Sequence, residues 1–176
     1  MRAVVVYESM YGNTRRIAEA IAEGLHDINT VVMQVAQADA VMTGGADLIV
    51  VGGPTHAFGM SRPQTRAQAV ENARRAGSTL TVEPGAAGPG IREWLASADL
   101  DGAATAVFDT RVRATRGMGH AASKIRRALR GRQCHLLSRP ESFFVTKQNE
   151  LLDGEIDRAR DWGASLAEEL ASRVQT

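Results

Sequence analysis

The sequence predicts an α/β fold, a three-layer doubly wound sandwich in which a five-stranded parallel sheet of order 2-1-3-4-5 lies between helices. Two observations support this prediction. Short, continuously apolar runs, which are typical of strands buried on both faces, alternate with helical patterns along the whole chain. This alternation produces βαβ units, which place successive strands in parallel. The length of 176 residues suits one domain, over residues 1–176, with a full hydrophobic core.

The first half of the chain contains three expected strands and two expected helices. Residues 4–7 form an apolar run, and from Thr14 apolar residues recur at steps of four, as on one face of a helix. Residues 31–35 are the second expected strand. Residues 48–51 have the strongest buried-strand pattern, which a Gly-Gly-Pro sequence ends, and a polar helix is expected over residues 63–76.

The second half continues the alternation after a long loop. Residues 77–90 are rich in Gly, Ala and Pro and lack a helical period, so we expect a loop with room for one short extended piece at 79–82. Long loops in compact domains are often functional, and this one either borders the ligand crevice or makes a subunit contact. A helix is expected at 91–98, followed by a strand at 104–108 and a helix with apolar residues over 118–129. A strand at 134–137 resumes at 143–145, and a last helix begins after Asp153.

Composition excludes several classes of protein. Hydrophobic residues make up 44% and charged residues 23% of the chain, as in globular proteins. No secretory signal and no apolar segment of membrane-spanning length is recognisable. The single cysteine, Cys134, excludes an internal disulfide, so we expect a cytoplasmic protein. The four histidines and one cysteine lack ligand spacing, and no metal site is expected.

Basic residues are unevenly distributed, although the net charge is only +1. Between Asp109 and Arg139 nearly all charged residues are basic, which raises the question of nucleic-acid binding. Arg126, Arg127 and Arg130 fall off the apolar stripe of their helix, as residues on a solvated face do. We therefore expect no nucleic-acid partner, and a docking surface for an acidic redox partner is the sharper alternative.

The turn after the first strand has the features of a phosphate site. A helix begins at or near its end, and a helix N-terminus offers unpaired N–H groups and a positive dipole end. Hydroxyl donors and one glycine are present, whereas lysine and arginine are absent. A dinucleotide-binding turn needs three glycines and a Walker-type loop needs Gly-Lys-Ser/Thr, so neither fits. The candidate residues are Ser9, Met10, Tyr11, Gly12, Asn13 and Thr14.

The pattern Ser9-x-x-Gly12-Asn13-Thr14 after an N-terminal strand resembles the phosphate loop of flavodoxins. This resemblance implies a flavodoxin-like fold and flavin mononucleotide (FMN) as the cofactor. Tyr11 departs from the pattern, because short-chain flavodoxins usually have Thr or Ser there. The Met-Tyr-Gly version is closer to the branch that holds NAD(P)H:quinone reductases. The backbone N–H of Tyr11 stays available to a phosphate, but the short hydroxyl donor is lost.

Two further loops are implied as flavin contacts by the same resemblance. After the third strand, Pro54-Thr55 is similar to the family's Gly-x-Pro-Thr segment, and His56 and Phe58 are candidates for packing on the ring, with His56 as a polar wall and not a catalytic base. The loop after the fourth strand offers no aromatic residue between 109 and 125. Its arginines predict a less negative flavin potential, because cations stabilise anionic reduced flavin. The candidate residues of the two loops are Pro54, Thr55, His56, Ala57, Phe58, Gly59, Asp109, Thr110 and Arg111, with Arg113 and Arg116 as further cations.

Three functions fit this reading. The first is a flavodoxin-like FMN electron carrier, which needs no catalytic acid or base because the cofactor carries the chemistry. The second is an NAD(P)H-dependent FMN quinone reductase, which Tyr11 and the basic third loop favour. The third is a flavodoxin-fold binding module without flavin, suggested by the missing aromatic residue. The expected partner is a redox protein or a quinone-like molecule, and the protein is a monomer or a homodimer.

Overall fold

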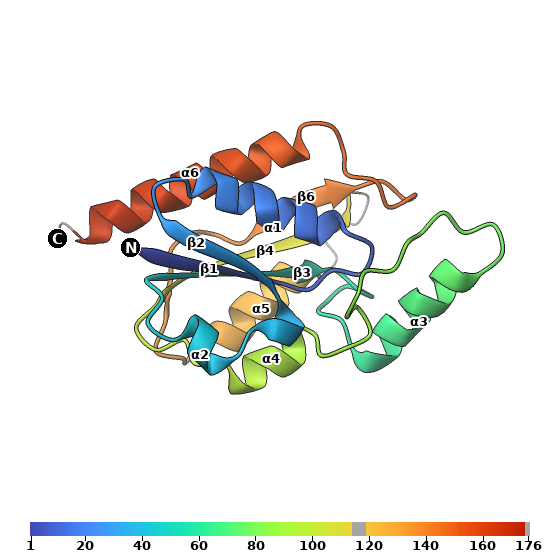
Figure 1. Ribbon diagram of the computed structural model, residues 1–176, viewed down its shortest axis with the longest axis horizontal. Helices are drawn as coiled ribbons and strands as arrows, with labels where there is room; N and C mark the ends of the chain where they lie inside the picture. The colour runs from blue at the N-terminus through green and yellow to red at the C-terminus, as the bar shows by residue number, and fades with distance from the viewer. Residues whose placement is uncertain (114–118, 175–176) are drawn as a thin grey trace.

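The structure, a computed structural model, describes residues 1–113 and 119–174, and its core is a parallel β-sheet between two layers of helices (Figure 1). The strand order is β2-β1-β3-β4-β5, with β6 also paired to β4, and every pairing is parallel. The predicted fold class and strand order are therefore confirmed. The strands are β1 (Arg2–Tyr7), β2 (Asn29–Gln34), β3 (Leu48–Pro54), β4 (Ala104–Val112), β5 (His135–Leu136) and β6 (Glu141–Val145).

Two short strands share the fifth position of the sheet. β5 pairs with the start of β4 and β6 with its end, in the registers Ala104↔His135 and Phe108↔Glu141. The expectation that the fifth strand stops and resumes is thus confirmed. The interruption lets the chain continue beside β4 as far as Val112↔Val145, so β6 ends at the edge where the other strands end.

Helices cover both faces of the sheet. In Figure 1, α1 and α6 lie above the sheet and α2, α4 and α5 lie below it, while α3 stands to the side at the carboxyl ends of the strands. One core cluster packs Ile17 and Leu166 against the upper face, and the other packs Trp94 and Ile125 against the lower face. The helices are α1 (Asn13–Gly24), α2 (Ala40–Thr43), α3 (Pro63–Arg74), α4 (Ile91–Ser97), α5 (Ala121–Leu129) and α6 (Glu155–Val174), with a 3₁₀ turn η1 (Val35–Gln37).

Strand β4 is longer than its sequence pattern predicts. The apolar run ends at Phe108, but the strand continues to Val112. Its polar continuation is stable because β3 pairs with it as far as Pro54↔Thr110 and β6 pairs with it on the other side. Asp109, Thr110 and Arg111 therefore lie in a strand, and the expectation that they form a loop is wrong. Residues 79–82 form no strand, and the short helix α2 was not expected from the sequence.

Helices α1 and α6 cross in very close contact. A Cβ atom added to Gly163 would lie 2.2 Å from the carbonyl oxygen of Ile21, and one added to Gly24 would lie 2.0 Å from that of Arg160. Real side chains never approach backbone so closely, so the crossing depends on both glycines. The contact fixes α1, whose N-terminus faces the candidate site. Among the described residues, no helix combines the length and the apolarity that crossing a membrane requires.

Candidate functional site

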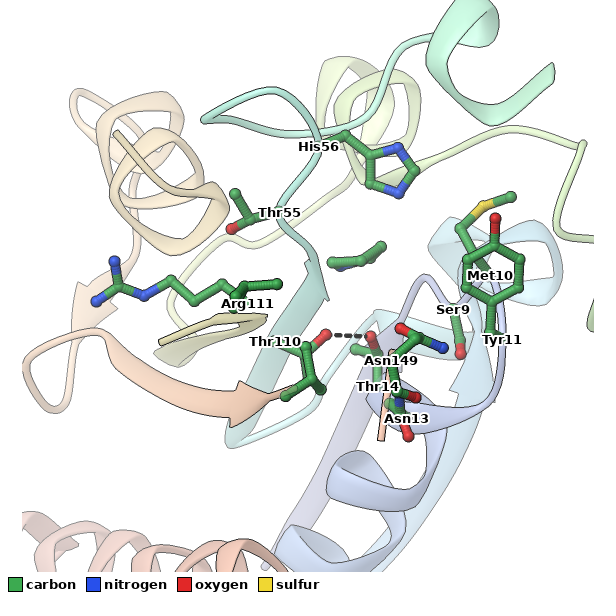
Figure 2. A pocket seen from close by; sticks show the side chains of 13 residues that line it. Ser9, Met10, Tyr11, Asn13, Thr14, Thr55, His56, Thr110, Arg111 and Asn149 are labelled. Carbon is green, nitrogen blue, oxygen red and sulfur yellow. Dashed lines mark hydrogen bonds between the residues drawn. The ribbon is translucent and has the colours of Figure 1, made fainter. Parts of the chain in front are cut away.

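A cavity of about 160 Å³ lies at the carboxyl ends of β1, β3 and β4, where a doubly wound sheet places its ligand crevice (Figure 2). In this view His56 lies across the cavity from Thr14 and Thr110. Most of the sequence-predicted residues meet here, together with three others. The lining residues are Ser9, Met10, Tyr11, Asn13, Thr14, Pro54, Thr55, His56, Thr110, Arg111, Val112, Val145 and Asn149.

The turn over residues 9–14 is shaped around its own backbone donors. Gly12 has a left-handed φ of 95°, and its N–H donates to Ser9 Oγ at 3.1 Å. Helix α1 follows directly, and its first helical hydrogen bond runs from the N–H of Arg16 to the carbonyl oxygen of Gly12 at 3.0 Å. Within the described part of the chain, the N–H groups of Tyr11, Asn13 and Thr14 have no protein acceptor. The turn therefore presents free donors at the positive end of a helix dipole, as an anion site requires.

Two hydroxyl groups meet between the turn and β4. Thr14 Oγ1 and Thr110 Oγ1 are 2.7 Å apart, and both residues are buried. Figure 2 shows this contact as the link between the start of α1 and the strand opposite. Because each hydroxyl has one proton and two lone pairs, the pair keeps one proton to give to a ligand. The hydroxyl pair is therefore suited to donate one hydrogen bond to an anionic oxygen beside it.

The back of the turn is anchored by α3 and by residues 77–90. Tyr11 Oη donates to the carbonyl of Ala69 at 2.7 Å, and Glu83 N–H donates to the carbonyl of Met10 at 2.9 Å. Met10 is buried in a small apolar cluster that includes Ala69 and Ala86. The long loop thus holds the turn from behind, although none of its residues 77–90 lines the cavity of Figure 2. The Tyr11 hydroxyl serves as an anchor, which explains why a tyrosine can replace a short hydroxyl donor here.

An ion pair closes the outer side of the turn. Arg15 Nε lies 2.6 Å from a carboxylate oxygen of Glu83, and its Nη1 lies 2.9 Å from Glu19. The hydrogen bond from Glu83, with that from Glu19, raises the pKa of Arg15 above its ordinary value. Since Arg15 offsets the charge of Glu83, that carboxylate repels an anion in the turn less strongly.

The segment after β3 divides between two cavities. Pro54, Thr55 and His56 line the cavity of Figure 2, as predicted from the sequence. The three residues that follow turn away and line a neighbouring cavity, with Phe58 45% exposed. The reason is a tight two-residue turn, in which His56 and Gly59 exchange backbone hydrogen bonds of 2.9 and 3.0 Å. The residues that turn away are Ala57, Phe58 and Gly59.

His56 is shielded from solvent and close to charged groups. Burial lowers the pKa of His56 from its ordinary value of 6.5; the Glu8 carboxylate opposes this shift, and the Arg66 guanidinium adds to it. The imidazole is therefore neutral at neutral pH, as suits a wall residue. The unfolded chain takes up a proton on His56 as the pH falls below 6.5, whereas the folded protein resists it, so this residue reduces stability at acid pH.

We expect an NMR titration to find the His56 midpoint below 6.5, with a His56→Gln variant assigning the signal. The variant should also lose less stability than the wild type when the pH is lowered from 6.5, measured by urea unfolding. A midpoint at or above the ordinary value, or equal acid sensitivity of the two proteins, would contradict this account.

Asp109 is fully buried and organises the wall of the cavity without lining it. Its Oδ2 accepts from Thr55 Oγ1 at 3.1 Å, from His120 Nδ1 at 2.8 Å and from the N–H of Ala122 at 2.9 Å. Thr55 Oγ1 in turn accepts from the N–H of Ala121 at 2.9 Å. One carboxylate therefore ties the segment after β3 to the N-terminus of α5, where a negative charge is favourable.

An Asp109→Asn variant should lose about 1–2 kcal/mol of unfolding free energy, because the amide keeps the shape but removes the charge that three donors share. Urea unfolding measures this loss. Asp101→Asn is the matched control, since Asp101 is exposed and its side chain accepts no hydrogen bond in the described residues. Equal stability of the two variants would show that the Asp109 charge is not needed.

Comparison with protein families gives a match over most of the chain. The model of the family described as flavodoxin matches residues 5–161. The chain belongs to the flavodoxin family. Members of this family bind FMN, and the protein is in this general sense an FMN-binding electron-transfer protein. A comparison with curated proteins gave no match.

Solved flavodoxin structures share the fold over almost the full length. A flavodoxin from the domain Archaea has 20% identity and a TM-score of 0.66, covering 97% of this chain and 99% of that one. Oxidised Flavodoxin 1 from Bacillus cereus has 19% identity and a TM-score of 0.65, with coverages of 96% and 98%. A flavodoxin described as WrbA-like, from Agrobacterium tumefaciens, has 20% identity and a TM-score of 0.60, with coverages of 97% and 98%.

The arginines after Asp109 lie further from the crevice than the sequence suggests. Arg111 lines the cavity with its stem, but in Figure 2 its guanidinium points away from the cavity. The guanidinium carbons of Arg111 and Arg113 lie 5.5 and 6.0 Å from the centre of the Phe144 ring. Arg116 lies outside the described residues. The two described guanidinium groups are therefore directed to the ring of Phe144.

Three lining residues of the flavodoxin site were missed by sequence reasoning. Val112 and Val145 end β4 and β6, and Asn149 lies in the segment after β6 with a left-handed φ of 64°. Asn13 Nδ2 donates to the carbonyl of Asn149 at 2.7 Å. The polar run after the last strand was the available signal, because parallel strands all end at the crevice edge. Among the described residues, no group of three His, Cys, Asp or Glu side chains could hold a metal ion.

Proposed function

We propose that FMN binds with its phosphate in the turn over residues 9–14 and its ring system between that turn, the segment after β3 and the end of β4. The observation that supports this most directly is the set of free N–H groups on Tyr11, Asn13 and Thr14, at the start of a helix and beside the Thr14–Thr110 hydroxyl pair. A dianionic phosphate is the acceptor that suits such donors best.

The residues of the chain orient the cofactor and need not react. Pro54, Thr55 and His56 form one wall, Thr110, Arg111 and Val112 form another, and Asp109 holds these walls together. The backbone of residues 57–59 continues the first wall beyond the cavity. FMN supplies one- and two-electron chemistry when it is bound, so no protein acid or base is required. A single-domain electron carrier is the function that this arrangement supports best.

Cofactor titration tests this proposal. The purified protein should be yellow, and after removal of the flavin it should bind FMN in a one-to-one ratio by isothermal calorimetry. Riboflavin, which lacks the phosphate, should bind at least about 100-fold more weakly, because it leaves the turn donors without an anion. A colourless protein that binds neither compound would overturn the proposal and favour a binding module without flavin.

An NAD(P)H-dependent quinone reductase is the second candidate. It is supported by Tyr11, by the fold shared with a WrbA-like flavodoxin, and by a basic cavity next to the crevice. Adding NADPH to the FMN-loaded protein without oxygen should bleach the flavin if this candidate is right. A flavin that is reduced only after a separate reductase is added supports the electron carrier.

The partner and the location follow from the same reasoning. A redox protein or a quinone-like molecule is the proposed partner, and a nucleic acid is not. Cys134 as the one cysteine suits a reducing cytoplasm. Sedimentation velocity distinguishes a monomer from a homodimer.

A further inference from the structure

A second cavity of about 420 Å³ lies next to the crevice and shares His56 with it. Its size is in the range of cavities that hold small molecules. It is formed by the tight turn after β3, the start of α3, Arg92 of α4 and Lys124 of α5. The two cavities are therefore adjacent at His56.

Three basic side chains surround the cavity without an acidic partner. Arg62, Arg92 and Lys124 line it, and in residues 1–113 and 119–174 none of them has a carboxylate within 4.0 Å. Arg92 is held by the backbone, since its Nε donates to the carbonyl of Ser61 at 3.2 Å and its Nη2 to that of Met60 at 3.3 Å. Three cations on one cavity without a carboxylate within 4.0 Å attract an anion.

The start of α3 adds to the positive field. This helix has 12 residues, and Arg62 is its N-cap residue. Thr65 in its first turn also lines the cavity. The positive end of the helix dipole and the three cations thus act on the same space, and a phosphate group suits both.

A strained turn presents an aromatic ring at this cavity. Ala57 and Phe58 have φ values of 43° and 66°, which side chains with a Cβ rarely adopt. Such strain persists only where the surrounding structure holds it, and it is concentrated at sites of function. Phe58 is also among the most exposed large apolar side chains of the described residues. A flat apolar ring beside cations suits a ligand that carries both an aromatic ring and a phosphate.

We propose that this cavity binds the phosphate group of an aromatic nucleotide, with Phe58 against the aromatic ring and Arg62, Arg92 and Lys124 around the phosphate. The binding itself is independent of the crevice. The nucleotide then lies beside His56, at the edge that the two cavities share.

Calorimetric titration of the FMN-loaded protein with three probes tests the inference. ADP carries both features, pyrophosphate only the charge, and adenosine only the ring system. We expect ADP to bind more tightly than pyrophosphate, and adenosine most weakly. Arg62→Gln and Lys124→Gln should each weaken the binding of ADP and of pyrophosphate at least about fivefold. Phe58→Ala should weaken the binding of ADP and leave that of pyrophosphate unchanged.

Arg127→Gln is the matched control, because Arg127 is exposed on α5 but does not line the cavity. It should change no affinity by more than about twofold. Absence of ADP and pyrophosphate binding to the wild type, or an equal loss in Arg127→Gln, would overturn the inference. If FMN fails to bind, the same titrations on the flavin-free protein still report on the cavity. Failure of the FMN proposal and failure of this inference are therefore distinguishable.

Discussion

Replacing Gly163 with alanine is expected to lower the free energy of unfolding by about 3 kcal/mol or more, the upper end of the cost of overpacking a core. The added Cβ would lie 2.2 Å from the carbonyl oxygen of Ile21, a backbone atom that cannot rotate away. Helices α1 and α6 would have to separate. Because α1 begins at the turn over residues 9–14, where we propose that the FMN phosphate binds, FMN affinity should fall in the same variant. Urea unfolding measures the stability, and FMN titration measures the affinity.

The sign of this effect is informative, because glycine to alanine inside a helix normally stabilises it by up to about 1 kcal/mol. Ser165→Ala, on the exposed face of the same helix, is the control and should change stability by less than about 0.5 kcal/mol. Gly24→Ala should reproduce the loss, since its Cβ would meet Arg160 O at 2.0 Å. A Gly163→Ala protein as stable as the wild type would show that α1 and α6 lie further apart than the structure places them.

The sheet was predictable because its strands are buried on both faces. The run at residues 48–51 is continuously apolar for this reason, and the stripe that begins after Thr14 reports the face that α1 buries. The strand predicted at 104–108 continues to Val112, because buried strand residues can also be polar. Asp109 is fully buried, but three donors brought by distant segments compensate its charge.

The sequence predicts the parts of the candidate site that a single continuous segment forms, and it misses the parts that depend on the tertiary fold. The shape of the turn over residues 9–14 depends on its own backbone and on the helix that follows. Its local sequence therefore predicts an anion site. Asn149 enters the cavity from the far end of the chain, and its position depends on where β6 ends. Phe58 turns away because of a tight turn with two positive φ values, which an Ala-Phe sequence does not predict.

A Thr14→Val variant is expected to bind FMN roughly 10- to 100-fold more weakly, because valine keeps the shape of threonine but removes a hydrogen bond to a charged phosphate. Thr14 is buried at the start of α1, 2.7 Å from the hydroxyl of Thr110, so no solvent-exposed group can take its place. Thr110→Val should have a similar effect. Because the two hydroxyls are hydrogen-bonded to each other and have one proton left to give, the double variant should lose less than the sum of the two free-energy changes.

Riboflavin distinguishes loss of a phosphate contact from damage to the fold. Its affinity should be the same for the wild type and for Thr14→Val, since it has no phosphate to lose. Thr105→Val is the matched control: Thr105 is buried at the other end of β4, where its hydroxyl donates to the carbonyl of His135. That variant should leave the ratio of FMN to riboflavin affinity unchanged. Equal weakening of both compounds by Thr14→Val would mean that the hydroxyl supports the turn and does not bind the phosphate.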